Sequence, residues 1–199
     1  MYWHSSTIIE HLSDLCRNDT SKILAYWYFN FRDKDEDKKN VDTLLCSLIR
    51  QLSAGADALP PDVLKLRDEY KRASKRPGTD KLATVLKSII GELGKDVFIV
   101  MDALDEFPEN ARERYLLVQI EHLGGKYENL HILATSRPEV DIRNSLETVA
   151  TAIINIEHSV ETDVRLFVRR RLEGEKRLKR WEAVVKDDIE HKLVGSGEV

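Results

Sequence analysis

Hydrophobic and polar positions follow two different periods along this chain. Apolar residues recur at intervals of three and four in several segments, which are residues 5–16, 44–52, 59–70, 82–93, 116–123, 164–172 and 181–193. That spacing gathers apolar side chains on one face of a helix. The pattern therefore predicts an amphipathic helix in each of these segments.

Four shorter apolar runs lie between the predicted helices, at residues 23–31, 97–101, 130–135 and 152–156. The first three are rich in β-branched or aromatic side chains and too short for helices, as buried strands are. The fourth, AIINI, alternates poorly but is equally apolar. Helices that alternate with short buried strands predict an α/β fold of three layers, with a mostly parallel sheet of about four strands. The charged run at 32–39, RDKDEDKK, predicts a solvated loop.

Three acidic residues follow the strand at 97–101, in the sequence DVFIVMDALDE. Ligands of open α/β sheets bind beyond the carboxyl ends of the strands, where Asp102, Asp105 and Glu106 would emerge. Carboxylates there are typical of a Walker B element, in which Asp102 would hold Mg²⁺, directly or through water. Asp105 or Glu106 would then orient or deprotonate the attacking water of a nucleotide hydrolase. The alternative is a buried strand that ends in a solvated acidic turn.

Arg137 follows the strand at 130–135 at nearly the position that the acidic residues hold after theirs. One amphipathic segment separates the two strands, which predicts adjacent parallel strands joined by a crossover helix. Arg137 and Asp102 would then share one edge of the sheet, where a guanidinium can bind a terminal phosphate. The alternative is that Arg137 pairs with the acidic residues or caps a helix.

Composition and charge exclude several classes of function. With 31 basic and 35 acidic residues the net charge is −4, which gives no electrostatic case for nucleic acid or an anionic membrane as partner. The basic run at 165–180 keeps an apolar stripe, as the solvated face of an amphipathic helix does. No secretion signal or membrane span is visible in the sequence. Cys16 and Cys46 form no disulfide framework, which favours a reduced, cytoplasmic setting. The six histidines show no metal-ligand spacing.

A phosphate-binding loop is absent from the sequence. Such a loop needs G-x-x-x-x-G-K-[ST], because its glycines let backbone amides surround the phosphates and its lysine neutralises them. The two Gly-Lys pairs, at Gly94 and Gly125, are followed by Asp96 and Tyr127. Neither pair can therefore form a P-loop.

Two motifs carry a family resemblance. VFIVMDALDEFPE and, downstream, LHILATSRPE resemble the Walker B and sensor segments of NACHT-type P-loop NTPases. SSTIIEHL, AYWYFNF and RLKRW are similar to segments of the nephrocystin-like N-terminal NACHT modules of fungal STAND proteins, which are signalling NTPases of the NOD-like receptor kind. The resemblance implies Mg²⁺ and ATP or GTP as cofactors. It implies metal binding at Asp102, catalysis at Asp105 and Glu106, and nucleotide sensing at Arg137.

The resemblance also shapes the expected domain organisation. Residues 1–160 are expected to form a partial P-loop-NTPase-like core without its first strand, the P-loop strand, which in the family lies between the sensor strand and the last strand. Residues 161–199 would begin a helical extension. The expected function is a partial nucleotide-binding domain that is inactive as an isolated chain and associates with protein partners, or with itself, through flanking domains. The alternative is a degenerate, non-catalytic module for protein–protein interaction, so enzymatic activity stays open.

Overall fold

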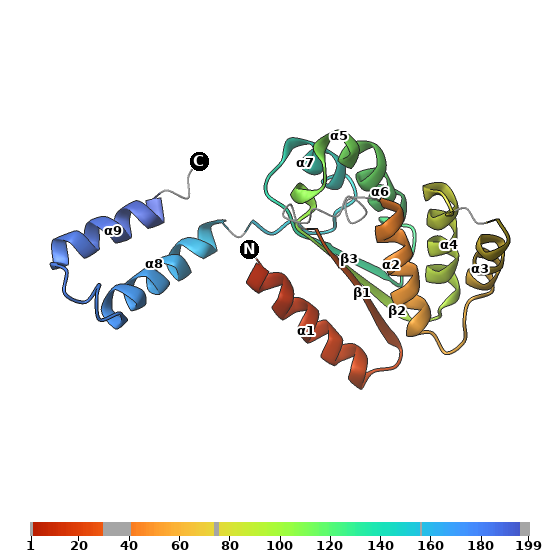
Figure 1. Cartoon of the computed structure of the whole chain (residues 1–199), viewed down its shortest axis with the longest axis horizontal. Helices are drawn as coiled ribbons and strands as arrows, with labels where there is room; N and C mark the ends of the chain where they lie inside the picture. Colours follow the sequence, from red (N-terminus) through yellow and green to blue (C-terminus); the bar gives the residue numbers. More distant parts are fainter. Residues whose placement is uncertain (1, 30–40, 74–75, 156, 196–199) are drawn as a thin grey trace. The chain divides into compact units, whose positions relative to one another are not determined.

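The sheet is built from three of the apolar runs. In the computed structural model, which describes residues 2–29, 41–73, 76–155 and 157–195, the strands are β1 (Lys22–Tyr28), β2 (Asp96–Asp102) and β3 (Leu130–Ala134). They lie side by side in the order β1-β2-β3, and both pairs are parallel (Figure 1). The structure confirms the predicted α/β fold with an open parallel sheet. The predicted loop at 32–39 lies outside the described residues.

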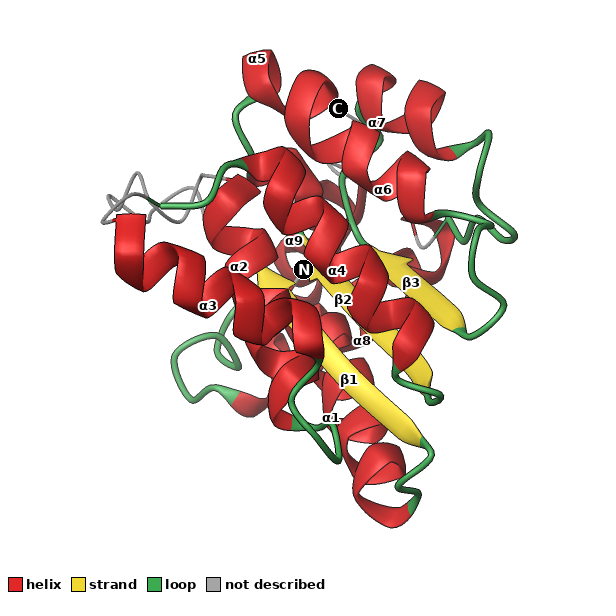
Figure 2. Cartoon of the chain, turned by 90° about the vertical axis from the view of Figure 1, so that its right-hand side faces the viewer, coloured by secondary structure: helices red, strands yellow, loops and turns green. Residues whose placement is uncertain are grey.

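Helices cover both faces of the sheet. Helix α1 (Tyr2–Asn18) contacts β1 and β2 on one face, while α2 (Val41–Ala54) and α4 (Thr79–Glu92) lie on the other (Figures 1 and 2). Helix α3 (Pro61–Ala73) packs against α4 in front of that second layer. The main core lies between the sheet and the helices of the second layer, where the apolar faces of α2, α4, β1 and β2 meet. Burial of that area is the main driving force for this arrangement.

The exposed edge of β1 is protected by a side chain. The amide of Gln51, on α2, donates to the carbonyl of Tyr26 (2.9 Å) and accepts from its N–H (3.1 Å). These bonds occupy backbone groups that another strand could otherwise pair with. Among the described residues, the sheet therefore ends at β1, with a helix side chain in place of a further strand.

The segments that follow β2 and β3 form the surroundings of the candidate site. After β2 come the 3₁₀ turn η2 (Leu104–Glu106), the short α5 (Glu109–Ala111), the π-helical η3 (Arg112–Leu117) and α6 (Val118–Leu123). Leu116, Leu117, Ile120 and Leu123 are buried, as the helical spacing predicts. Helix α7 (Val140–Leu146) follows β3 and contacts η3 and α6.

The chain divides into two compact units, Met1–Thr151 and Ala152–Val199. The second unit contains α8 (Glu157–Gly174) and α9 (Ala183–Gly195), which pack on each other. The Arg169 guanidinium donates to the Glu190 carboxylate (2.6 Å) and holds the pKa of that carboxyl below its usual value. Arg169, which belongs to the basic run, therefore links α8 to α9. Residues 177–180 lie in turns and not in a helix.

The predicted strand at 152–156 is the main error in the expected fold. Residues 152–155 form no strand, residue 156 lies outside the described part, and the side chain of Ile154 is 81% exposed. A strand needs a neighbouring ladder to satisfy its backbone. In the described ranges β3 pairs with β2 alone, and this run forms no ladder with the open edge of β3. The apolar helix face predicted at 164–172 is also only partly correct. Val168 and Leu172 are buried, but Phe167 is 63% exposed.

Across the described residues, no helix is both long and apolar enough to span a bilayer.

Candidate functional site

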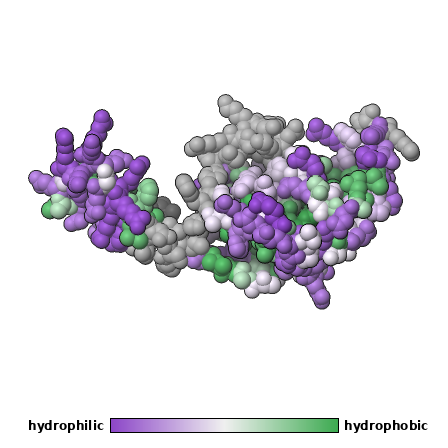
Figure 3. All heavy atoms as spheres, turned by 90° about the horizontal axis from the view of Figure 1, so that it is seen from below, coloured by the Kyte–Doolittle hydropathy of each residue, from purple (hydrophilic) through white to green (hydrophobic). Residues whose placement is uncertain are grey.

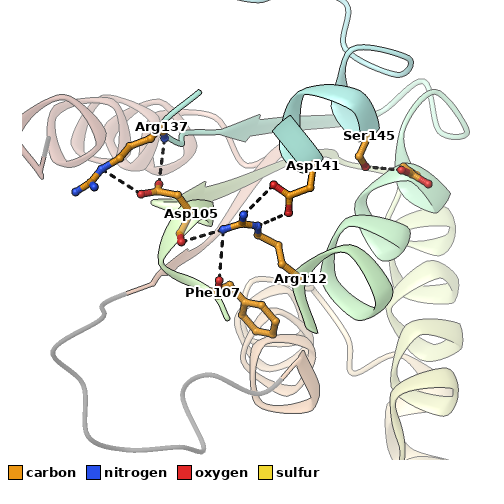
Figure 4. Close-up of polar contacts among 7 residues, drawn as sticks. Asp105, Phe107, Arg112, Arg137, Asp141 and Ser145 are labelled. Carbon is orange, nitrogen blue, oxygen red and sulfur yellow. Dashed lines mark hydrogen bonds and ion pairs between the residues drawn. The ribbon is translucent and has the colours of Figure 1, made fainter. Parts of the chain in front are cut away.

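The carboxyl ends of β2 and β3 form one edge of the sheet, here called the rim. Met101 pairs with Ala134 in the parallel register, so Asp102 and Thr135 leave the two strands side by side. Asp105 and Arg137 follow within a few residues and are in contact (Figure 4). The predicted adjacency of the two strands, with Asp102 and Arg137 at a shared edge, is confirmed.

Asp102 is held by a threonine that the sequence interpretation did not single out. The Thr135 hydroxyl donates to Asp102 Oδ1 (2.5 Å) and accepts from the N–H of Ala103 (3.0 Å). The Asp102 residue is only 2% exposed, and its carbonyl accepts from the N–H of Phe29 (3.0 Å). Thr135 thus fixes the direction of the carboxylate at the end of β2. The signal in the sequence was its place as the first polar residue after an apolar strand.

Replacing Thr135 by valine is expected to lower the free energy of unfolding by about 2 kcal/mol, because it removes a hydrogen bond to the buried Asp102 carboxylate and the acceptor of the Ala103 N–H. Serine at the same position keeps the hydroxyl and should recover most of that loss. Urea denaturation of the three proteins measures the difference. Equal losses for valine and serine would contradict the assigned role of the hydroxyl.

The turn after Asp102 depends on a left-handed residue. Ala103 has φ 60° and ψ 54°, a conformation that costs a non-glycine residue energy. It lets Leu104 bury its side chain while the Leu104 N–H donates to the carbonyl of Thr135 (2.9 Å). The acidic residues that follow are thereby directed along the rim toward β3.

Asp105 is engaged with Arg137 in this structure. Its Oδ1 accepts from the backbone N–H of Arg137 (3.1 Å), and its Oδ2 lies 3.4 Å from the Arg137 Nε. The Asp105 side chain is 8% exposed, whereas that of Arg137 is 68% exposed. The pairing of Arg137 with the acidic residues, which was the alternative to phosphate binding, is what the structure contains.

Arg112 is the largest feature of the site that sequence interpretation missed. It is 3% exposed, and its Nε and Nη2 donate to both carboxylate oxygens of Asp141 on α7 (2.7 and 2.8 Å). Its Nη1 donates to the carbonyls of Asp105 (2.9 Å) and Phe107 (3.4 Å), as Figure 4 shows. The hydrogen bonds between Arg112 and Asp141 raise the pKa of Arg112 and lower that of Asp141. One guanidinium therefore ties the acidic turn to α7.

The rim offers oxygen ligands but no complete cage for a metal. Among the described residues, no group of three or more acidic, histidine or cysteine side chains is placed to hold an ion. Mg²⁺ in nucleotide sites is commonly held by one or two carboxylates together with phosphate and water. The Asp102 carboxylate and the Thr135 hydroxyl, both hard oxygen donors, fit that requirement.

The two Gly-Lys pairs lie far from the rim. Gly94 and Lys95 precede the amino end of β2, and the Lys95 ammonium binds Asp57 (2.9 Å) and the carbonyl of Gly55 (3.2 Å). Gly125 and Lys126 precede β3 in the same way. Each lysine lies before the amino end of its strand, and even the shorter strand, β3, is about 16 Å long, so neither lysine can reach a phosphate at the rim.

Comparison with protein families finds a match to the model described as nephrocystin 3, N-terminal, over residues 3–137. The chain belongs to this family. The match runs from α1 to Arg137, so this nephrocystin 3 N-terminal region includes the whole sheet and every predicted site residue. Asp141 and the second compact unit lie beyond it. Neither the curated proteins nor the solved structures contain a significant match.

Proposed function

We propose that this member of the nephrocystin 3 N-terminal family carries the acidic half of a Mg²⁺–nucleotide site in a NACHT-type domain of a STAND signalling protein in the cytoplasm. One observation carries the proposal: the Asp105 carboxylate, in the turn after β2, faces the Arg137 guanidinium, which follows the adjacent parallel strand. Open α/β sheets bind ligands at this edge. The motifs DALDE and TSRP supply the residues.

The contacts suggest a distinct role for each residue. Asp102, oriented by Thr135, would hold Mg²⁺, which neutralises phosphate charge when it is bound. Asp105 would position Arg137, since its carboxylate already holds the Arg137 amide, and Arg137 would contact the terminal phosphate of ATP or GTP. Glu106 would then orient or deprotonate the attacking water. This assignment gives Asp105 and Glu106 different roles, whereas the motif alone does not distinguish them.

The proposal requires a phosphate-binding loop supplied from outside these residues. Triphosphate binding in this fold class depends on backbone amides and a lysine that offset several negative charges. Arg137 cannot replace them, because one such interaction contributes only about 1.5–3 kcal/mol before the costs of ordering. The 199-residue chain should therefore bind Mg·ATP weakly and hydrolyse none at a useful rate.

Calorimetric titration of two proteins tests this proposal. The 199-residue chain should show a Kd above about 1 mM for Mg·ATP, and a version with a P-loop strand joined before Met1 should bind far more tightly. In the extended protein, Asp102→Ala should lower Mg²⁺-dependent affinity. Glu106→Gln should keep binding and slow hydrolysis by about 10²–10⁴-fold. Equal loss of binding in both variants would contradict the roles, and so would micromolar binding by the short chain that Asp102→Ala abolishes.

A non-catalytic interaction module is the second candidate. It is favoured by the apolar side chains that the second unit exposes, among them Ile154, Phe167 and Val184. Such side chains are typical of surfaces that contact other proteins or a second copy. An extended protein that folds and self-associates but binds no nucleotide would favour this candidate.

A further inference from the structure

A cavity of about 370 Å³ lies between α2, α3 and α4, and none of the rim residues lines it. Its walls are mostly apolar and come from Ile49, Ala54, Leu59, Val63, Leu66 and Leu82. On the right of Figure 3, where Figure 1 places α3 and α4, hydrophobic residues are exposed among hydrophilic ones. Apolar cavities of this size with a few polar groups are typical of small-molecule sites.

Polar contacts and apolar packing both anchor α3 beside the cavity. The Ser88 hydroxyl of α4 donates to Asp62 (2.7 Å), and Lys81 lies 3.3 Å from Glu69. Both contacts join α3 to α4. The apolar residues of α3 that line the cavity, Val63 and Leu66, pack against the main core and are partly buried. The part of their apolar surface that stays exposed is available to a ligand.

Three polar side chains lie along the α2 wall of the cavity, at Cys46, Arg50 and Ser53. The Ser53 hydroxyl is buried and has no hydrogen-bond partner within the described ranges. A buried hydroxyl without a partner is unfavourable, so the site gains from a ligand group that pairs with it. Arg50 is exposed, and no ion pair with another described residue occupies its guanidinium. Residues three apart on a helix are neighbours, so Arg50 and Ser53 can reach the same headgroup.

We propose that this cavity binds a medium-chain carboxylic acid. The alkyl chain would lie against Leu59, Val63 and Leu66, while the carboxylate accepts hydrogen bonds from Arg50 and Ser53. A volume of about 370 Å³ lies at the lower end of the range for small-molecule sites, which suits a chain of about ten carbons. Decanoate has this size. Arginine favours a carboxylate headgroup because its guanidinium can donate two parallel hydrogen bonds.

Protection of the two cysteines from alkylation provides an internal control. Cys46 lines the cavity, whereas Cys16 lies on α1, across the sheet. Desolvation raises the pKa of both thiols, and the Cys46 residue is the more exposed of the two, so each labelling rate is compared with its own rate without ligand at one alkaline pH. Decanoate at ten times its Kd should slow N-ethylmaleimide labelling of Cys46 about tenfold and leave Cys16 unchanged. Equal slowing of both cysteines, or of neither, would overturn the proposal.

Two variants and a matched control test the assigned contacts. Arg50→Gln should weaken decanoate binding about tenfold, the effect of losing about 1.4 kcal/mol, and leave decanol binding unchanged. Leu66→Trp, which fills the cavity, should abolish protection by both ligands. Arg67→Gln, on α3 but outside the lining, should change nothing. Protection by decanol equal to that by decanoate in the unmodified chain would overturn the carboxylate assignment.

Discussion

Replacing Arg112 by alanine is expected to lower the free energy of unfolding by about 3 kcal/mol, the lower end of the range for breaking a buried ion pair. The change removes both hydrogen bonds to Asp141 and leaves the carbonyls of Asp105 and Phe107 without a donor. The lower end applies because the Asp141 side chain is 20% exposed, so water can reach part of it. Urea denaturation of the 199-residue chain measures the loss. Arg114→Ala, on the exposed side of the same segment, should cost less than about 0.5 kcal/mol.

The same ion pair predicts a pH dependence with a definite sign. The hydrogen bonds from Arg112 lower the pKa of Asp141, so the folded protein binds this proton less readily than the unfolded chain. The stabilisation is therefore complete above the unfolded pKa of about 3.9 and is lost as pH falls toward the folded pKa. Between about pH 5 and pH 3 the unmodified chain should lose more stability than Asp141→Asn, which has no carboxylate there. Identical pH slopes would contradict the assignment.

The sequence predicts β2 and β3 well because their burial is visible locally. Each is a short run of apolar residues with polar groups after it, and one amphipathic segment between them requires a crossover. The run at 152–156 has much the same composition yet forms no strand in its described residues. The difference is not local. A strand forms only where a neighbouring ladder receives its hydrogen bonds, and composition does not show whether such a neighbour exists.

The candidate site likewise contains residues that the sequence could place and residues that only the fold brings together. Asp102 and Arg137 could be placed at one rim because strand ends fix their positions. Arg112 could not, since its partners on η2 and α7 are brought together only by the fold. A signal was present nevertheless. Arg112 precedes Leu116 by four residues and so occupies the apolar face of that helical segment, where a charged residue needs a partner.

The left-handed turn at Ala103 could not be predicted from residue type either, and it yields a pair of predictions with opposite signs. Alanine at φ 60° is strained by about 1–2 kcal/mol, while glycine there loses about 0.5–1 kcal/mol more chain entropy on folding. Ala103→Gly should therefore raise the free energy of unfolding by about 0.5–1 kcal/mol. Ala103→Val should lower it by about 2–4 kcal/mol, because a β-branched residue adds strain at this φ and overpacks a buried position.

The valine variant should also disturb the rim. A shift of this turn moves Asp105 away from the Arg137 amide, so hydrogen exchange of that amide should become faster in Ala103→Val and stay unchanged in Ala103→Gly. Denaturation and hydrogen exchange on the three proteins measure both effects. If glycine and valine destabilise the chain to the same extent, Ala103 is not under strain in solution. The direction of Asp105 would then have to come from the contacts of Arg112 and Thr135 alone.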